Sequence, residues 1–181
     1  MTSKSSSTAY GTVAVSLHWL TVLLIIALLG SGMLADETSD PAAKAQILTA
    51  HAPMGIAVLL LTLARLVWWW RFDTHPDPLA GDPAWQIKAA KAVHGLLYLA
   101  ILVMAASGIG LFVLSGAGDI VFGGAAGPLP DFADFTPRLP HGIGGKLLLA
   151  LFVLHAAAAL FHHFVRRDAT LRRMWFGRRE N

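Results

Sequence analysis

Histidine is the residue type in this sequence that is most suited to chemistry, because of its number and its surroundings. The chain has eight histidines and no cysteine among its 181 residues. Seven of the eight lie in, or at the edge of, long apolar stretches. An imidazole in such a stretch is costly unless a hydrogen bond or a metal satisfies it. The eighth, His75, falls in a segment rich in proline and aspartate, where we expect it to be solvated.

The spacing of histidines in the last apolar stretch places several of them along one helical face. His141 and His155 are 14 residues apart, and at 100° per residue the two directions differ by only about 40°. A rise of 1.5 Å per residue separates them by roughly 21 Å along the axis. His162 continues nearly the same stripe, whereas His163 points about 100° away from it.

Four stretches are long and apolar enough to position these histidines in a bilayer. Hydrophobic residues make up 55% of the chain and charged residues 14%, whereas a soluble domain carries about 25% charge. Windows of about 20 residues predict spans at about 13–34, 50–70, 92–114 and 141–165. We therefore expect one all-α domain over residues 1–181, an integral membrane four-helix bundle. Its first helix is expected to begin near Thr8, as a cap.

Basic residues near the span ends predict the orientation. Most lie in the N-terminal segment, the second connection and the C-terminal tail: Lys4, Arg71, Lys88, Lys91 and six arginines from Arg166 onward. The other two connections hold only Lys44 and Arg138 and are acidic overall. The positive-inside rule then places both termini in the cytoplasm. A signal peptide ending at Ala35 is the alternative for the first stretch, but its basic region is weak.

Comparing depths sorts four histidines into two pairs. His51 and His141 begin the second and fourth spans on the outer side, while His18 and His155 lie toward the inner half of the first and fourth. One such histidine alone would suit an interhelical hydrogen bond. Two pairs at two depths suit two stacked macrocycles, each iron held by two imidazoles. Structural zinc is the rival, but it needs four close ligands and no thiolate is available.

Small and basic residues near these histidines suit a flat, anionic cofactor. Small residues follow three of the histidines and would let a ring or helix approach closely: Gly55, Gly142, Gly144, Gly145 and Ala156 to Ala159. Arg65, 14 residues after His51, is predicted to hold a propionate of the inner haem, with snorkelling to the headgroups as the alternative. Lys146 could serve the outer haem. Without cysteine, any haem must be bound non-covalently.

The sequence resembles the bacterial cytochrome b561 family over essentially its whole length. The resemblance rests on HW at His18–Trp19, HAPMG around His51 and LHAAAALFHHFVRRDATLRRM near the end. It implies a multi-pass, four-helix protein of the bacterial inner membrane with two haems b. By position in these motifs, His18 and His155 would hold the inner haem, and His51 and His141 the outer one. These are the pairs that depth had already given.

Within that family, the chain looks most like the small stand-alone members that oxidise superoxide at the periplasmic face and reduce ubiquinone. The resemblance implies a quinone site near the inner haem, with His162 beside the quinone. His94 is a second candidate for that site, with an interhelical hydrogen bond as its alternative. Because the outer loops are acidic overall, attraction of superoxide would need local positive charge. Arg138 and Lys146 are predicted to supply it.

Two other functions stay open at this point. The protein could carry electrons to quinone from a periplasmic dehydrogenase or another protein donor, docked on the acidic loop at 115–140. It could also be a haem-free membrane protein whose histidines serve a metal or a proton pathway. Nucleic-acid binding is not expected, because the basic residues flank apolar stretches and form no separate basic domain.

Overall fold

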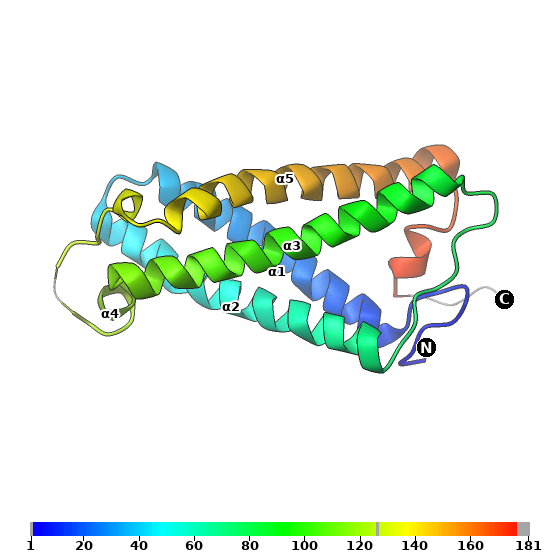
Figure 1. Cartoon of the computed structure of the whole chain (residues 1–181), viewed down its shortest axis with the longest axis horizontal. Helices are drawn as coiled ribbons and strands as arrows, with labels where there is room; N and C mark the ends of the chain where they lie inside the picture. Colours follow the sequence, from blue (N-terminus) through cyan, green and yellow to red (C-terminus); the bar gives the residue numbers. More distant parts are fainter. Residues whose placement is uncertain (1, 126, 177–181) are drawn as a thin grey trace. The chain divides into compact units, whose positions relative to one another are not determined.

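Four long helices make up most of the fold in the computed structural model, which describes residues 2–125 and 127–176 (Figure 1). They are α1 (Thr12–Glu37), α2 (Pro41–Arg71), α3 (Ala84–Ser115) and α5 (Arg138–Phe161). The shorter elements are α4 (Ala117–Val121) and the turns η1 (Phe132–Asp134), η2 (His162–Arg166) and η3 (Arg172–Met174). The described residues contain no β-strand, so the predicted all-α fold is confirmed.

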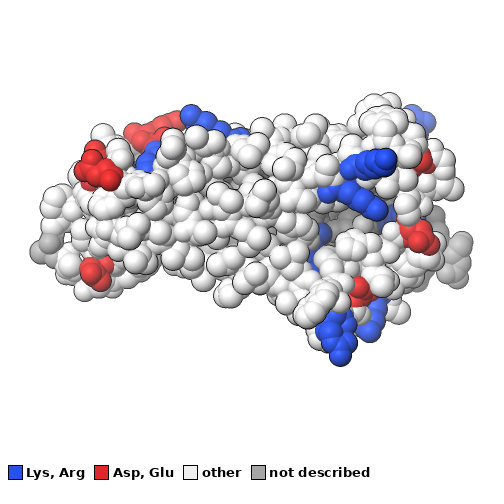
Figure 2. All heavy atoms as spheres, in the orientation of Figure 1, with Lys and Arg blue, Asp and Glu red and all other residues white. Residues whose placement is uncertain are grey.

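The four long helices have the length and composition to cross a membrane. Each predicted span lies within one of them, the last within α5 and η2 taken together. Large apolar side chains such as Leu23, Leu60 and Val113 are exposed, as lipid-facing residues would be. On the face drawn in Figure 2, uncharged surface covers the middle of the helices. The predicted membrane protein with four spanning helices is therefore supported.

The first helix begins at Thr12, so the predicted start near Thr8 is wrong. The preceding residues fold back on themselves instead of continuing the helix. The backbone N–H of Thr8 donates to Ser6 Oγ at 3.4 Å, and the N–H of Gly11 donates to Ser5 Oγ at 3.0 Å. These side-chain bonds offer the backbone an alternative to helical bonding.

Asp73, just after α2, anchors this N-terminal segment. Its carboxylate accepts hydrogen bonds of 2.8 to 3.1 Å from the backbone N–H and hydroxyl of Ser5, from Trp68 Nε1 and from the Thr74 N–H. Burial by itself raises the pKa of Asp73. The hydrogen bonds from Ser5, Trp68 and Thr74 outweigh it and lower that pKa below its ordinary value.

The residues group into two compact units, and every long helix contributes to both. Unit 1 comprises Met1–Thr21, Leu61–Tyr98 and Ala150–Asn181, and unit 2 comprises Val22–Leu60 and Leu99–Leu149. Each predicted histidine pair lies within one unit: His18 and His155 in unit 1, His51 and His141 in unit 2.

Candidate sites at the two histidine pairs

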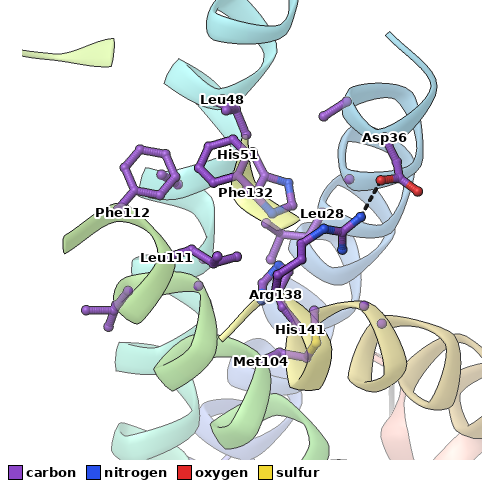
Figure 3. A pocket seen from close by; sticks show the side chains of 18 of the residues that line it. Leu28, Asp36, Leu48, His51, Met104, Leu111, Phe112, Phe132, Arg138 and His141 are labelled. Atoms are coloured by element: carbon purple, nitrogen blue, oxygen red, sulfur yellow. Dashed lines mark hydrogen bonds and ion pairs between the residues drawn. The ribbon is translucent and has the colours of Figure 1, made fainter. Parts of the chain in front are cut away.

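In unit 2, the rings of His51 on α2 and His141 on α5 lie next to each other in a T-shaped arrangement (Figure 3). Their centroids lie 6.4 Å apart, with the ring planes at 70°. A metal–imidazole bond is about 2 Å long, and the ring nitrogen lies about 1.2 Å from the ring centre. Two rings on opposite sides of one metal therefore have centroids roughly 6 to 6.5 Å apart. The pair is spaced for one metal atom between the rings.

A serine hydroxyl binds the Nδ1 atom of each of these histidines. Ser31 Oγ of α1 lies 2.9 Å from His51 Nδ1, and Ser107 Oγ of α3 lies 3.0 Å from His141 Nδ1. Each hydroxyl also donates to a backbone carbonyl earlier in its own helix, at 3.3 Å and 2.7 Å respectively. With its proton on that carbonyl, each serine oxygen can accept from the Nδ1–H of its histidine, and this tautomer leaves Nε2 with the lone pair that binds a metal.

The glycine that follows each serine makes room for the same ring. A Cβ at Gly32 would lie 3.3 Å from Cε1 of His51, and a Cβ at Gly108 would lie 3.1 Å from Cε1 of His141. Both distances are tighter than ordinary van der Waals contact, so the absence of a side chain lets the ring lie against the helix. In both α1 and α3, the serine therefore bonds to a histidine ring and the glycine after it leaves room for that ring.

The glycines that the sequence singled out have other neighbours. A Cβ at Gly144 would meet Met104 Sδ at 2.8 Å, and one at Gly142 would meet the guanidinium of Arg138 at 3.0 Å. Gly55 has no such neighbour within 4 Å among the described residues. Gly144 therefore serves the packing of α5 on α3, which is the plainer of its two predicted roles.

A cavity of about 1150 Å³ surrounds the pair in unit 2. Ligand pockets typically measure about 300 to 1,000 Å³, so this one can take a large cofactor. Apolar side chains line most of it, including Leu48, Leu111, Phe112 and Phe132 (Figure 3).

Arg138 and Lys146 also line this cavity. Arg138 Nη2 forms an ion pair with Asp36 Oδ1 at 2.5 Å, with the arginine side chain 36% exposed and the aspartate 68%. Figure 3 shows the two side chains reaching toward each other beside the histidines. Much of the positive charge predicted to attract an anion is therefore paired with a carboxylate.

In unit 1, His18 on α1 and His155 on α5 repeat the spacing. Their centroids lie 6.2 Å apart, with planes at 72°. His94 of α3 approaches His155 edge-on at 5.1 Å, closer than two rings on opposite sides of one metal. His18 and His155 are therefore the pair with metal-ligand spacing. No group of three or more His, Asp or Glu side chains that could hold a metal ion occurs in residues 2–125 and 127–176.

Arg65 on α2 contacts His18 from the side. Its Nη1 lies 3.1 Å from His18 Nδ1, and its guanidinium lies 5.8 Å from the Tyr98 ring centroid. Because arginine only donates, Nδ1 of His18 is the acceptor in this arrangement. Arg65 Nε and Trp69 Nε1 are buried and have no hydrogen-bond partner within the described part of the chain. Two buried donors one helical turn apart suit an anionic acceptor such as a carboxylate.

His162 is held by hydrogen bonds at both ring nitrogens. Arg166 Nη1 donates to Gln86 Oε1 at 2.8 Å, so the Gln86 amide N–H faces His162 Nε2 at 2.7 Å. His162 Nδ1 then donates to Asp168 Oδ2 at 2.5 Å. Burial raises the pKa of Asp168, but hydrogen bonds from Thr170 and His162 outweigh it and lower that pKa below its ordinary value. Asp168 is therefore an ionised acceptor at neutral pH.

Comparison with known proteins decides the family. The family model described as prokaryotic cytochrome b561 matches residues 9–177. This chain belongs to the prokaryotic cytochrome b561 family. Cytochrome b561 homolog 1 of Escherichia coli (strain K12) is 32% identical over 168 residues, which cover 87% of this chain and 92% of that protein.

Two further relatives cover a similar share. The Yersinia pestis protein named probable superoxide oxidase CybB is 31% identical over 173 residues, 91% of this chain and 94% of that protein. Cytochrome b562 of Cereibacter sphaeroides is 30% identical over 172 residues, with the same two shares.

Membership of the cytochrome b561 family makes this chain a multi-pass bacterial membrane protein that binds haem b and transfers electrons. The haem-free alternative is set aside on that ground. Both histidine pairs fit such a group: each has the spacing of two ligands on one iron. In unit 2, glycines leave room for the two histidine rings, which an added Cβ would crowd. In unit 1, two buried N–H donors need an acceptor.

In this cytochrome b561 protein, the two residues of the HW motif make separate contacts. His18 joins the pair in unit 1, while Trp19 Nε1 donates to the Met174 carbonyl at 2.6 Å and packs edge-on against Trp175. His75, predicted to be solvated, is exposed and stacks on Trp69 at 3.9 Å.

Sequence reasoning missed the Ser-Gly pairs beside the ligand candidates in unit 2. The signal was present, because the same dipeptide occurs at Ser31-Gly32 and again at Ser107-Gly108, each in a predicted span.

Proposed function

We propose that this protein oxidises superoxide at the periplasmic face of the inner membrane and passes the electrons to ubiquinone near the cytoplasmic side. The observation that carries the proposal is the presence of two histidine pairs, each spaced for one iron, in two separate units. The name of the Yersinia pestis relative supports superoxide as the donor. Residues 1–181 would then form one di-haem domain.

Four histidines would hold the two haems b. His18 and His155 would bind the inner one and His51 and His141 the outer one, without covalent attachment because the chain has no cysteine. When bound, the haems supply one-electron transfer from superoxide to quinone. Because two imidazoles would hold each iron, the haems would supply electron transfer without binding superoxide directly.

Arg65 would hold a propionate of the inner haem, together with Trp69. To bind iron through Nε2 as a neutral ring, His18 needs its proton on Nδ1. Arg65 must then release that nitrogen and find another acceptor. The buried Nε of Arg65 and the indole N–H of Trp69 offer donors for the propionate carboxylate.

Quinone would bind close to the unit 1 pair, with His162 and His94 as the candidate residues. His162 lies between the Gln86 amide and the ionised Asp168, and these two partners fix the orientation of its ring. His162→Leu is expected to slow quinone reduction and leave haem reduction by superoxide unchanged. Equal slowing of both steps would contradict this placement.

Haem counting tests the ligand assignment. His51→Ala and His141→Ala are each expected to lose about one haem per protein, measured as the ratio of haem to protein after purification. His163→Ala is the matched control, because the His163 ring packs edge-on against its neighbour Phe164, and it should keep both haems. Full haem retention in both cavity variants would falsify the pairing.

A protein electron donor is the second candidate, and one observation favours it. Unit 2 carries six acidic and three basic residues, and Arg138 is paired with Asp36. Such a surface suits a basic protein better than a small anion. Stopped-flow measurement of haem reduction by superoxide, compared with reduction by candidate donor proteins, separates the two. Slow reduction by superoxide and fast reduction by a protein would overturn our first choice.

A further inference from the structure

The hydrogen bonds behind the two ligand candidates in unit 2 follow one pattern. In each case a serine hydroxyl lies within hydrogen-bond distance of a backbone carbonyl and of the histidine Nδ1. A histidine that binds metal through Nε2 carries its proton on Nδ1, so the hydroxyl then accepts from the ring and donates to the carbonyl. Ser31 and Ser107 come from different helices, α1 and α3, so the repetition is not a consequence of one local turn. Because each hydroxyl already donates to a carbonyl, its oxygen is a better acceptor than that of an isolated serine.

We propose that Ser31 and Ser107 are positioning residues that lower the reduction potential of the iron between His51 and His141. The proposal rests on the haem ligation proposed above. A ligand histidine whose Nδ1–H is accepted by a neighbour is a stronger electron donor to its metal. Stronger donation stabilises ferric over ferrous iron. Both ligand candidates in unit 2 have such a neighbour, so the two effects act in the same direction.

The surroundings of the unit 1 pair differ. The group hydrogen-bonded to His18 Nδ1 is the Arg65 guanidinium, 3.1 Å away, and not a serine hydroxyl. In the proposed haem-bound state Arg65 turns to a propionate carboxylate, which balances its charge. The shift in potential proposed for Ser31 and Ser107 therefore applies to the unit 2 pair alone.

A redox titration of the purified holoprotein tests this role. Substitution of a residue that accepts the hydrogen bond of a metal-ligating histidine typically changes metal affinity or activity 10- to 100-fold. We expect Ser31→Ala and Ser107→Ala each to weaken the preference for ferric iron about tenfold, an upward shift of about 59 mV for one electron. Both variants should keep two haems. The haem that remains in His51→Ala identifies which of the two potentials belongs to the inner site.

Two controls separate the hydrogen bond from mere packing. Ser31→Thr keeps the hydroxyl and should keep the wild-type potential. Ser115→Ala removes another serine of α3 whose hydroxyl donates to its own helix, at the Leu111 carbonyl, and whose hydrogen bonds within the described residues involve no histidine. Its potentials should be unchanged.

The outcomes are distinct. Unchanged potentials in both alanine variants, or an equal shift in Ser115→Ala, would overturn the role of the serines and leave the ligands in place. Loss of haem in both alanine variants would also overturn it, because the serines would then be needed for retention. If only the variant at the buried Ser107 loses haem, the potential measured for Ser31→Ala, at a half-buried position, decides whether the role stands. Full haem retention in His51→Ala would instead count against the ligation itself.

Discussion

At the scale of single residues, the ion pair between Arg138 and Asp36 changes what the cavity in unit 2 offers an anion. Arg138 was expected to attract superoxide, but a carboxylate 2.5 Å away offsets most of its field at a distance. Lys146 lines the same cavity. Attraction, if it is local, depends on the balance among these three charges.

This balance predicts opposite effects for removing opposite charges. Asp36→Asn should raise the rate of superoxide oxidation about two- to fivefold, whereas Arg138→Ala and Lys146→Ala should lower it by similar factors. Haem spectra should stay unchanged in all three. Stopped-flow rates at low and high salt provide the measurement, because screening should shrink every difference. Rates that are unaffected in all three variants would sink the idea of local steering.

Gly32 and Gly108 lead to a prediction about ring placement. A methyl group at either position would press on the Cε1 atom of a ligand candidate, at 3.3 and 3.1 Å. Overpacking of this kind costs about 1 to 3 kcal/mol, so Gly32→Ala and Gly108→Ala should retain the outer haem roughly 5- to 150-fold less tightly. Competition with a haem-binding acceptor protein measures this.

Gly30→Ala is the matched control in the same helix. A Cβ at Gly30 meets nothing within 4 Å among the described residues, so this variant should hold haem as wild type does. Equal haem loss in Gly30→Ala would show that any added methyl in α1 disturbs the fold.

The ligand candidates could be predicted from the sequence, but their hydrogen-bond partners could not. Helical periodicity fixes which residues share a face, as for His141 and His155. It does not say which residue of another helix lies opposite, so Ser31 and Ser107 went unnoticed. Arg65 was placed on a useful face, yet its contact with His18 follows only from the packing of α2 against α1.

At the scale of elements, helix interiors could be predicted and helix ends could not. The length of the apolar stretches alone located the four helices, because a helix must be apolar over about 20 residues to cross the hydrocarbon core. The start of α1 instead depends on Asp73, more than 60 positions away in sequence from Ser5. At the other end, α5 gives way to a π-helical turn at His162, so the 100° step that put His162 on the His155 stripe no longer applies there.

The N-terminal segment offers a test of the Asp73 anchor. Asp73→Asn removes the charge that accepts from Ser5, Trp68 and Thr74, so the Ser5 and Gly11 amides should exchange with deuterium about tenfold faster or more at neutral pH. Hydrogen exchange with mass spectrometry measures this. Asp77→Asn, in the same loop, is the control and should leave the exchange rate unchanged. Unaltered protection in Asp73→Asn would contradict the anchor.

The anchor also has a defined pH range. The pKa of Asp73 is lower in the folded protein than its unfolded value of about 3.9. The anchor therefore contributes fully above about pH 4 and is lost as the pH falls further, through the folded pKa. Protection of Ser5, corrected for intrinsic exchange, should stay constant from pH 7 down to pH 5.

At the scale of the whole molecule, charge separates the two units. Unit 1 carries eleven basic and five acidic residues, against three and six in unit 2. From the basic residues near the span ends, the sequence predicts that both termini face the cytoplasm. A C-terminal green fluorescent protein fusion should therefore fluoresce, and a C-terminal alkaline phosphatase fusion should be inactive. The reverse result would invert the orientation and place the proposed superoxide site in the cytoplasm.

The crossed imidazole planes, at 70° and 72° in the two pairs, have a magnetic consequence. When two axial ligand planes are nearly perpendicular, the two iron d orbitals that mix with them stay close in energy. Electron paramagnetic resonance of the oxidised protein should then show two strongly anisotropic low-spin signals, each dominated by one large g value. A rhombic spectrum with three well-separated g values would mean that the rings turn parallel on the metal.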